Sequence, residues 1–225
     1  MDLCRQGIEL FWPGIRLTVL HDKDYSKDTD LPEDVREVVR RVPYLRKVFD
    51  LPYIAPTDQL YCIDSDCMLF DEPHDWPDVA HLSVLPGRDG RVWLEQGSAI
   101  WESLGQPPLD LEYIFCGGCW SGKRSEMFEP YRELAIAYVR ECVKRGHDDA
   151  NVVGHAVVCE QCLLNGLWHL AYQDVFLSNY RYPLYRPNPG MALFHLSDVG
   201  RTRKGQRMMA AYRDTLARKR AQDGP

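Results

Sequence analysis

Apolar and polar positions along this chain follow two periods, one typical of strands and one typical of helices. Short apolar runs predict strands at 15–20, 60–63, 79–85 and 113–115. Apolar residues at helical spacing predict helices over 1–11, 32–48, 129–144, 161–170 and 206–217. Strands that alternate with helices indicate an α/β layer structure with a mostly parallel central sheet. In such a sheet, ligands bind beyond the carboxyl ends of the strands.

Composition places the chain among ordinary globular proteins. It has 225 residues, of which 45% are hydrophobic and 27% are charged, so a sizeable core is expected and disorder is not. The net charge of −6 argues against a dedicated nucleic-acid binder. Residues 201–220, however, carry eight Lys or Arg and one acidic residue. We therefore expect one domain over 1–200 and a basic C-terminal helix or tail over 201–225, which suggests a local anionic contact.

The chain shows no targeting signal. No apolar run approaches the length of a membrane span, and the N-terminus lacks a basic leader followed by a sustained apolar stretch. The expected location is therefore the cytoplasm. The eight cysteines are then expected to be reduced thiols.

The predicted strand at 60–63 runs directly into two carboxylates, Asp64 and Asp66. Carboxylates at the end of a buried strand are costly unless a cation or hydrogen bonds compensate them. Oxygen ligands of this kind suit Mg²⁺ or Mn²⁺. A metal ion held there could bridge a diphosphate and stabilise the charge that develops as a nucleotide leaves. The alternative is a solvated turn after a strand.

The segment DQLYCIDSDCMLF at 58–70 resembles the strand and DxD motif of GT-A glycosyltransferases. The similarity is greatest to the retaining families of glycogenin and of the bacterial lipopolysaccharide galactosyltransferases. Three further segments follow in the order that those families show: YIFCGGCWSG at 113–122, EQCLLNGL at 160–167, and a late histidine, His195, in ALFHLSDVG. Together the four segments span about 150 residues. The resemblance implies a single GT-A, Rossmann-like domain.

This resemblance also implies a reaction and a set of site residues. The reaction is metal-dependent transfer of a hexose from a nucleotide sugar, such as UDP-glucose, to an acceptor hydroxyl with retention of configuration. Mn²⁺ or Mg²⁺ would be held by Asp64, Asp66 and His195. Glu160 or Gln161 would face the anomeric carbon. The donor would lie against Ser65, Gly117, Gly118 and Asn165, with its phosphates near Arg201, Arg203 and Lys204.

The sequence departs from the family pattern at both ends. The late histidine is normally followed by Gly two residues on and then by Lys, but here Gly200 comes five residues after His195. The phosphate-binding cation therefore stays open among Arg201, Arg203 and Lys204. At the other end, the first helix begins almost at Met1, and residues 15–20 resemble the second strand of the family. The expected fold thus lacks the usual first strand.

Two other functions compete with this interpretation. The pairs Cys116/Cys119 and Cys159/Cys162 have the spacing of zinc ligands and would suit a non-catalytic, zinc-containing interaction module. Tightly held stoichiometric zinc would favour that module. A nucleotidyltransferase also uses acidic metal ligands, but the Gly-rich phosphate loop expected early in such a chain is missing here.

The acceptor is not specified by the sequence. A helix over 206–217 would place Met208, Met209, Tyr212 and Leu216 along one side. Docking of that side would leave basic residues on and after this helix available to contact an anion: Arg213, Arg218, Lys219 and Arg220. That anion could belong to a glycan, a lipid headgroup, the DNA of a phage with hydroxymethylated bases, or the acidic domain itself.

Overall fold

The computed structural model describes residues 2–17, 30–65, 67–70, 81–83, 88–111, 114–172, 193–195 and 203–223. Its helices are α1 (Asp2–Phe11), α2 (Glu33–Arg41), α3 (Arg46–Phe49), α4 (Leu51–Ile54), α5 (Arg88–Ser103), α6 (Arg132–Lys144), α7 (Val153–Ala156), α8 (Leu163–Ala171) and α9 (Arg203–Asp223). Its strands are β1 (Gln59–Ile63), β2 (Cys67–Leu69), β3 (His81–Ser83), β4 (Phe115–Lys123) and β5 (Leu193–His195). A 3₁₀ turn covers Pro43–Leu45, and π-helical turns cover Arg124–Phe128 and Val157–Cys162.

The strands form two small sheets, and every described pairing is antiparallel. The larger sheet has the order β1-β4-β3, and the smaller sheet joins β2 to β5. The mixed helix-and-strand class predicted from the sequence is confirmed. The mostly parallel sheet is not found among the described strands. Hydrophobic periodicity predicts where a strand lies but not its direction, which depends on how distant segments pair.

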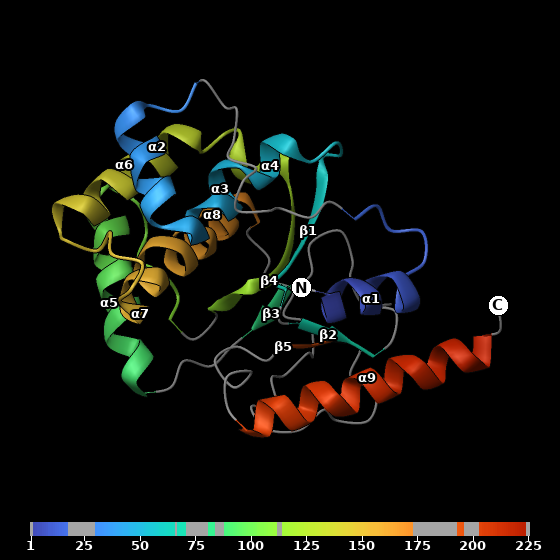
Figure 1. Cartoon of the computed structure of the whole chain (residues 1–225). Helices are drawn as coiled ribbons and strands as arrows, with labels where there is room; N and C mark the ends of the chain where they lie inside the picture. Colours follow the sequence, from blue (N-terminus) through green and yellow to red (C-terminus); the bar gives the residue numbers. More distant parts are fainter. Residues whose placement is uncertain are drawn as a thin grey trace.

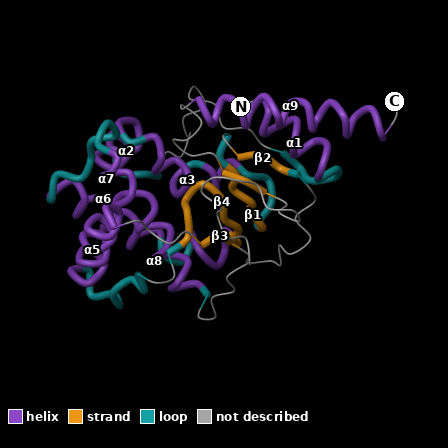
Figure 2. Tube along the Cα trace, turned by 90° about the horizontal axis from the view of Figure 1, so that it is seen from below, coloured by secondary structure: helices purple, strands orange, loops and turns teal. Residues whose placement is uncertain are grey.

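Helices lie on both sides of the strands (Figure 1). The helices α2, α5, α6, α7 and α8 gather on one side, while α1 and α9 lie on the other, next to β2 and β5. A view turned by 90° shows the same division (Figure 2). The buried residues form two clusters that match it, a large one that includes Val35, Trp101 and Trp168, and a smaller one around Ile8 and Tyr212.

Most of the predicted elements are present, with altered bounds. The predicted helices at 1–11, 129–144, 161–170 and 206–217 correspond to α1, α6, α8 and α9. The predicted helix over 32–48 is interrupted at Pro43, where Val42 has the extended angles φ −118° and ψ 79°. Proline has no N–H for the helical ladder and excludes helical angles from the residue before it.

Two parts of the strand prediction need correction or lie outside the description. Residues 15–17 form no strand, and 18–20 lie outside the described residues. The strand predicted at 113–115 meets β4 only at Phe115, and β4 continues through Gly117, Gly118 and Gly122 to Lys123. Helix α5 was not predicted, although its Leu94, Ile100 and Trp101 are fully buried.

The basic helix α9 packs against α1 and β2. Its Tyr212 and Leu216 are buried with Ile8 of α1, so the apolar side predicted from the sequence is the docked side. The hydroxyl of Tyr212 donates a 2.6 Å hydrogen bond to the carbonyl of Leu69 in β2. Among the residues that the structure describes, no helix combines the length and apolar character needed to cross a membrane.

Candidate functional site

The carboxyl end of β1 brings the predicted metal motif beside the predicted donor glycines. Strand β1 pairs with β4 so that Ile63 lies opposite Cys119. The backbone N–H of Asp64 continues this ladder with a 2.8 Å hydrogen bond to the carbonyl of Gly118. The carbonyl of Asp64 in turn accepts from the backbone N–H of Cys67 at 2.9 Å and from the thiol of Cys4 at 3.4 Å. The backbone around Asp64 is therefore fixed from three sides.

A lysine that the sequence did not indicate is the centre of this region. The Nζ of Lys47, in α3, lies 2.8 Å from Oδ1 of Asp64 and 2.9 Å from Oε1 of Glu160. It also donates to the carbonyl of Gly117 at 3.0 Å. An ammonium group has three N–H donors, so these three acceptors match its full capacity. We call Lys47, Asp64, Gly117 and Glu160 the Lys47 cluster.

Burial and charge act in opposite directions on Lys47. Its side chain is only 15% exposed, and this burial is the largest single influence, lowering the pKa. The carboxylates of Glu160 and Asp64 together outweigh it, so the pKa of Lys47 lies well above its usual value. The lysine therefore stays charged. The ammonium is thus shared by two carboxylates from distant parts of the chain.

The π-helical turn Val157–Cys162 places Glu160 in the cluster. The side chain of Glu160 is 9% exposed and lies against Gly117, where a Cβ would overlap its Oε1. Only glycine leaves room for the carboxylate there. Widened turns of this kind occur often at functional sites, because they redirect side chains without breaking the helix. Gln161 is partly exposed, and its carbonyl accepts a 2.7 Å hydrogen bond from the amide of Asn165, which is fully buried.

Part of the predicted metal site lies outside the described residues. Asp66 is not described, and for His195 only the backbone is described. That backbone lies opposite Cys67 in the β2–β5 pair, one residue along the chain from Asp66. Within the described part of the chain, no group of three His, Cys, Asp or Glu side chains is arranged to hold a metal ion. Of the three predicted ligands, Asp64 is the one whose side chain is placed, and it is 31% exposed.

The predicted cationic residues divide into two groups. Arg201 and the side chain of Lys204 lie outside the described residues, and Arg203 is exposed at the first position of α9. The residues predicted to contact an acceptor all lie on α9: Arg213, Arg218 and Arg220 are exposed, and Lys219 is partly buried. Ser65 is exposed in the turn between Asp64 and the undescribed Asp66.

The predicted zinc ligands are described for one pair. Cys159 and Cys162 are fully buried, while the side chains of Cys116 and Cys119 lie outside the description. The thiol of Cys159 donates to the carbonyl of His147 at 2.8 Å. Cys162 packs against Gly97 of α5, where a Cβ would overlap its sulfur. Both thiols thus act as small groups in close packing.

Sequence reasoning missed Lys47 because its neighbours suggest only a short helix. A signal was present: Arg46 and Lys47 are adjacent cations in a stretch where Leu45, Val48 and Phe49 are all apolar and buried. Arg46 forms its own buried ion pair with Asp50 at 2.8 Å. Charged residues are seldom buried unless they are paired, so two of them within an apolar turn indicate partners elsewhere in the chain.

Comparisons with protein-family models, with curated proteins and with solved structures find no match to this chain.

Proposed function

We propose that this protein is a metal-dependent glycosyltransferase that transfers a hexose from a nucleotide sugar, with UDP-hexose as the expected donor, to an acceptor hydroxyl with retention of configuration. One observation carries the proposal: Lys47 joins Asp64, Gly117 and Glu160 through contacts of 2.8, 3.0 and 2.9 Å. These three residues come from three of the segments that resemble GT-A enzymes. A donor site at the end of β1 would need these segments to lie together, and the contacts of Lys47 join them.

In this proposal Asp64 is one ligand of a divalent metal ion. The carboxylate of Asp64 is partly exposed, and a carboxylate has lone pairs for a second cation beside Lys47. The backbone register of β2 and β5 brings His195 opposite Cys67, next to Asp66. Asp64, Asp66 and His195 would hold Mn²⁺ or Mg²⁺. When bound, the ion would neutralise charge on the diphosphate as the nucleotide leaves.

The chain's own residues would act on the sugar. In the transfer, the bond from the anomeric carbon to the diphosphate breaks and a bond to the acceptor oxygen forms, while the acceptor hydroxyl loses its proton. The carboxylate of Glu160, held by Lys47, would stabilise the positive charge that develops at the anomeric carbon or attack it. Gly117 makes room for the carboxylate of Glu160, and Gly118 beside it has no side chain, so it would leave space for the sugar ring.

Release of nucleotide tests the metal and donor assignments together. With Mn²⁺ and a panel of nucleotide sugars, the wild-type protein should release nucleotide, and EDTA should stop the release. Asp64→Asn should lower the rate about a hundredfold or more, because it removes a carboxylate ligand of the metal ion that neutralises the leaving diphosphate. Asp58→Asn is the matched control. Asp58 lies just before the first residue of β1, and its carboxylate accepts hydrogen bonds from Ser125. Full activity in EDTA, or in Asp64→Asn, would refute the proposal.

The stereochemistry gives a separate test. Retention predicts that the product from an α-linked donor is α-linked. Proton NMR of the anomeric signal early in the reaction distinguishes the two outcomes. A β-linked first product would show that Glu160 does not act on the anomeric face as proposed.

A further inference from the structure

A groove of about 230 Å³ lies between helices α1 and α9, on the side of the molecule away from the large helical group. It is lined by Leu3, Gln6, Arg213, Leu216, Ala217 and Arg220. We call it the α1–α9 groove. Pockets for complete small ligands usually enclose about 300–1,000 Å³, so this groove is sized for one end of a larger molecule.

The groove combines cations with an apolar floor. Leu3, Leu216 and Ala217 form the apolar part, while Arg213 and Arg220 stand two helical turns apart on α9. Seven residues of helix span about 10 Å, so both guanidinium groups can reach one elongated anionic group. Such a lining suits an amphiphile, with an anion between the arginines and a short apolar chain on the floor.

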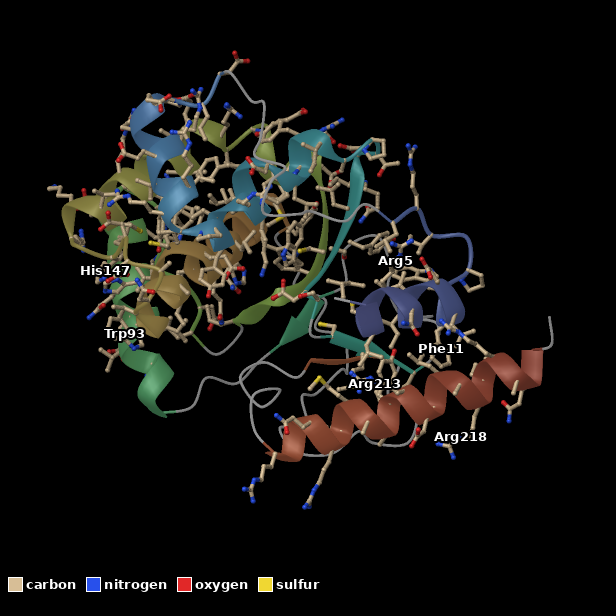
Figure 3. All side chains as sticks on the ribbon, in the orientation of Figure 1. Arg5, Phe11, Trp93, His147, Arg213 and Arg218 are labelled. Carbon is tan, nitrogen blue, oxygen red and sulfur yellow. The ribbon has the colours of Figure 1, made fainter. Side chains whose placement is uncertain are left out.

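Both arginines are available to an anion. Among the described residues, neither Arg213 nor Arg220 forms an ion pair with a carboxylate. Arg220 donates to the amide oxygen of Gln6 at 3.1 Å, which is a neutral partner. In Figure 3, Arg213 lies on the side of α9 that faces the body, whereas Arg218 points away from it. The guanidinium fork is the protein group best matched to phosphate oxygens.

The groove also lies close to the Lys47 cluster. Helix α1 forms one wall of the groove through Leu3 and Gln6. Cys4, which follows Leu3 in α1, donates its thiol to the carbonyl of Asp64 at 3.4 Å. Helix α1 therefore contacts both the groove and the backbone of Asp64.

We propose that the α1–α9 groove binds a phosphate group carried by an amphiphilic molecule. The phosphate could belong to a lipid within a bilayer or to a dissolved amphiphile. Both sources present the same chemistry to Arg213 and Arg220.

Titration with a short-chain phosphatidic acid, as dissolved monomers and without any nucleotide sugar, tests the groove by calorimetry. The wild-type protein should bind it saturably, with inorganic phosphate as a competitor. Arg213→Gln with Arg220→Gln should weaken binding about tenfold or more through lost charge-assisted hydrogen bonds. The matched control is Arg207→Gln with Arg16→Gln, which removes the same charge from exposed positions outside the groove. The control should bind as the wild type does.

A third variant tests the apolar floor without altering charge. Ala217 is exposed in the groove, so Ala217→Leu should fill the floor and weaken binding while α9 stays docked.

Vesicles of phosphatidylcholine with and without phosphatidic acid show whether the phosphate belongs to a bilayer lipid or to a dissolved molecule. If the protein sediments with the anionic vesicles, and the Arg213→Gln, Arg220→Gln variant does not while the control variant does, the phosphate belongs to a membrane lipid. If only the monomeric phosphatidic acid binds, the phosphate belongs to a dissolved molecule.

The proposal is overturned if neither probe binds saturably, or if both arginine pairs lower binding equally, because binding would then depend only on the total charge of the protein. If Ala217→Leu binds phosphatidic acid as tightly as the wild type does, the ligand does not lie on the apolar floor of the groove, and the proposal is likewise overturned. Nucleotide release by the wild-type protein is measured separately, so a failure of the proposed enzymatic function is distinguished from a failure of the groove.

Discussion

The ammonium of Lys47 lies 2.9 Å from the carboxylate of Glu160, although 113 positions separate the two residues in the chain. Both side chains are largely buried, and Asp64 shares the same ammonium. The ion pair therefore links α3, the end of β1 and the π-helical turn before α8. A contact of this kind makes both the stability of the fold and the geometry of the candidate site depend on one side chain.

Removing Lys47 should destabilise the protein strongly. Lys47→Met leaves the buried carboxylate of Glu160 without its cation, which should lower the free energy of unfolding by about 3 kcal/mol. Urea denaturation measures the change. Adding Glu160→Gln to Lys47→Met should recover part of the loss, because the uncompensated charge is then removed. The exposed pair of Arg140 and Asp34 provides the comparison, and Arg140→Met should change stability little. Equal effects of the two single variants would contradict the assigned role.

Gly117→Ala should displace Glu160. A Cβ at this position would overlap Oε1 of Glu160 and lie 2.8 Å from its Cδ, in a buried region with little room to adjust. We expect a loss of about 1–3 kcal/mol in the free energy of unfolding. The control on the same strand is Gly122→Ala, whose Cβ would meet the sulfur of Met127 at 2.9 Å, at the flexible part of that side chain. A Gly117→Ala protein as stable as the control would show that the carboxylate is not confined there.

The docking of α9 on α1 predicts coupled effects at Tyr212 and Gly7. Tyr212→Phe removes the hydrogen bond to Leu69 and should cost about 1 kcal/mol. Gly7→Ala should also destabilise, because its Cβ would overlap the hydroxyl of Tyr212. In the double variant that hydroxyl is absent, so the combined loss should be smaller than the sum of the single losses. Chemical denaturation of the four proteins gives the coupling, and strict additivity would contradict the packing described.

His147 should make the protein sensitive to mild acid. Burial lowers its pKa, the neighbouring His155 and Arg145 lower it further, and Asp148 opposes them. The folded state therefore resists protonation of His147 more than the unfolded state does. The stability from this effect is present above about pH 6.5 and is lost as the pH falls through the lowered pKa.

Melting temperatures between about pH 7.5 and pH 5 test this prediction. The wild type should lose more stability over that range than His147→Gln. Since burial is the main cause, His155→Gln should retain most of the acid-induced loss. Parallel pH profiles for the wild type and His147→Gln would rule out the assignment.

Local patterns in the sequence were sufficient for most helices and for β1. Apolar spacing identified α1, α6, α8 and α9, since a helix that packs on a core must repeat its apolar positions about every 3.6 residues. Helix α5 escaped because Gly97, Ser98 and other small or polar residues interrupt its pattern. Those residues fit close packing, as where Gly97 meets Cys162. Such a requirement comes from the neighbouring element and leaves no periodic signal.

From the residue pattern alone it follows that carboxylates come after an apolar strand at Asp64, that small residues occupy 117–118, and that an acidic residue opens the segment at 160–167. The role of Lys47 follows only from the three-dimensional fold, through contacts that span 17, 70 and 113 positions of the chain. The fold also decides that β4 runs antiparallel to β1. Periodicity reflects how each segment meets the core, whereas a buried charge is compensated through space by whichever partner the fold brings near it.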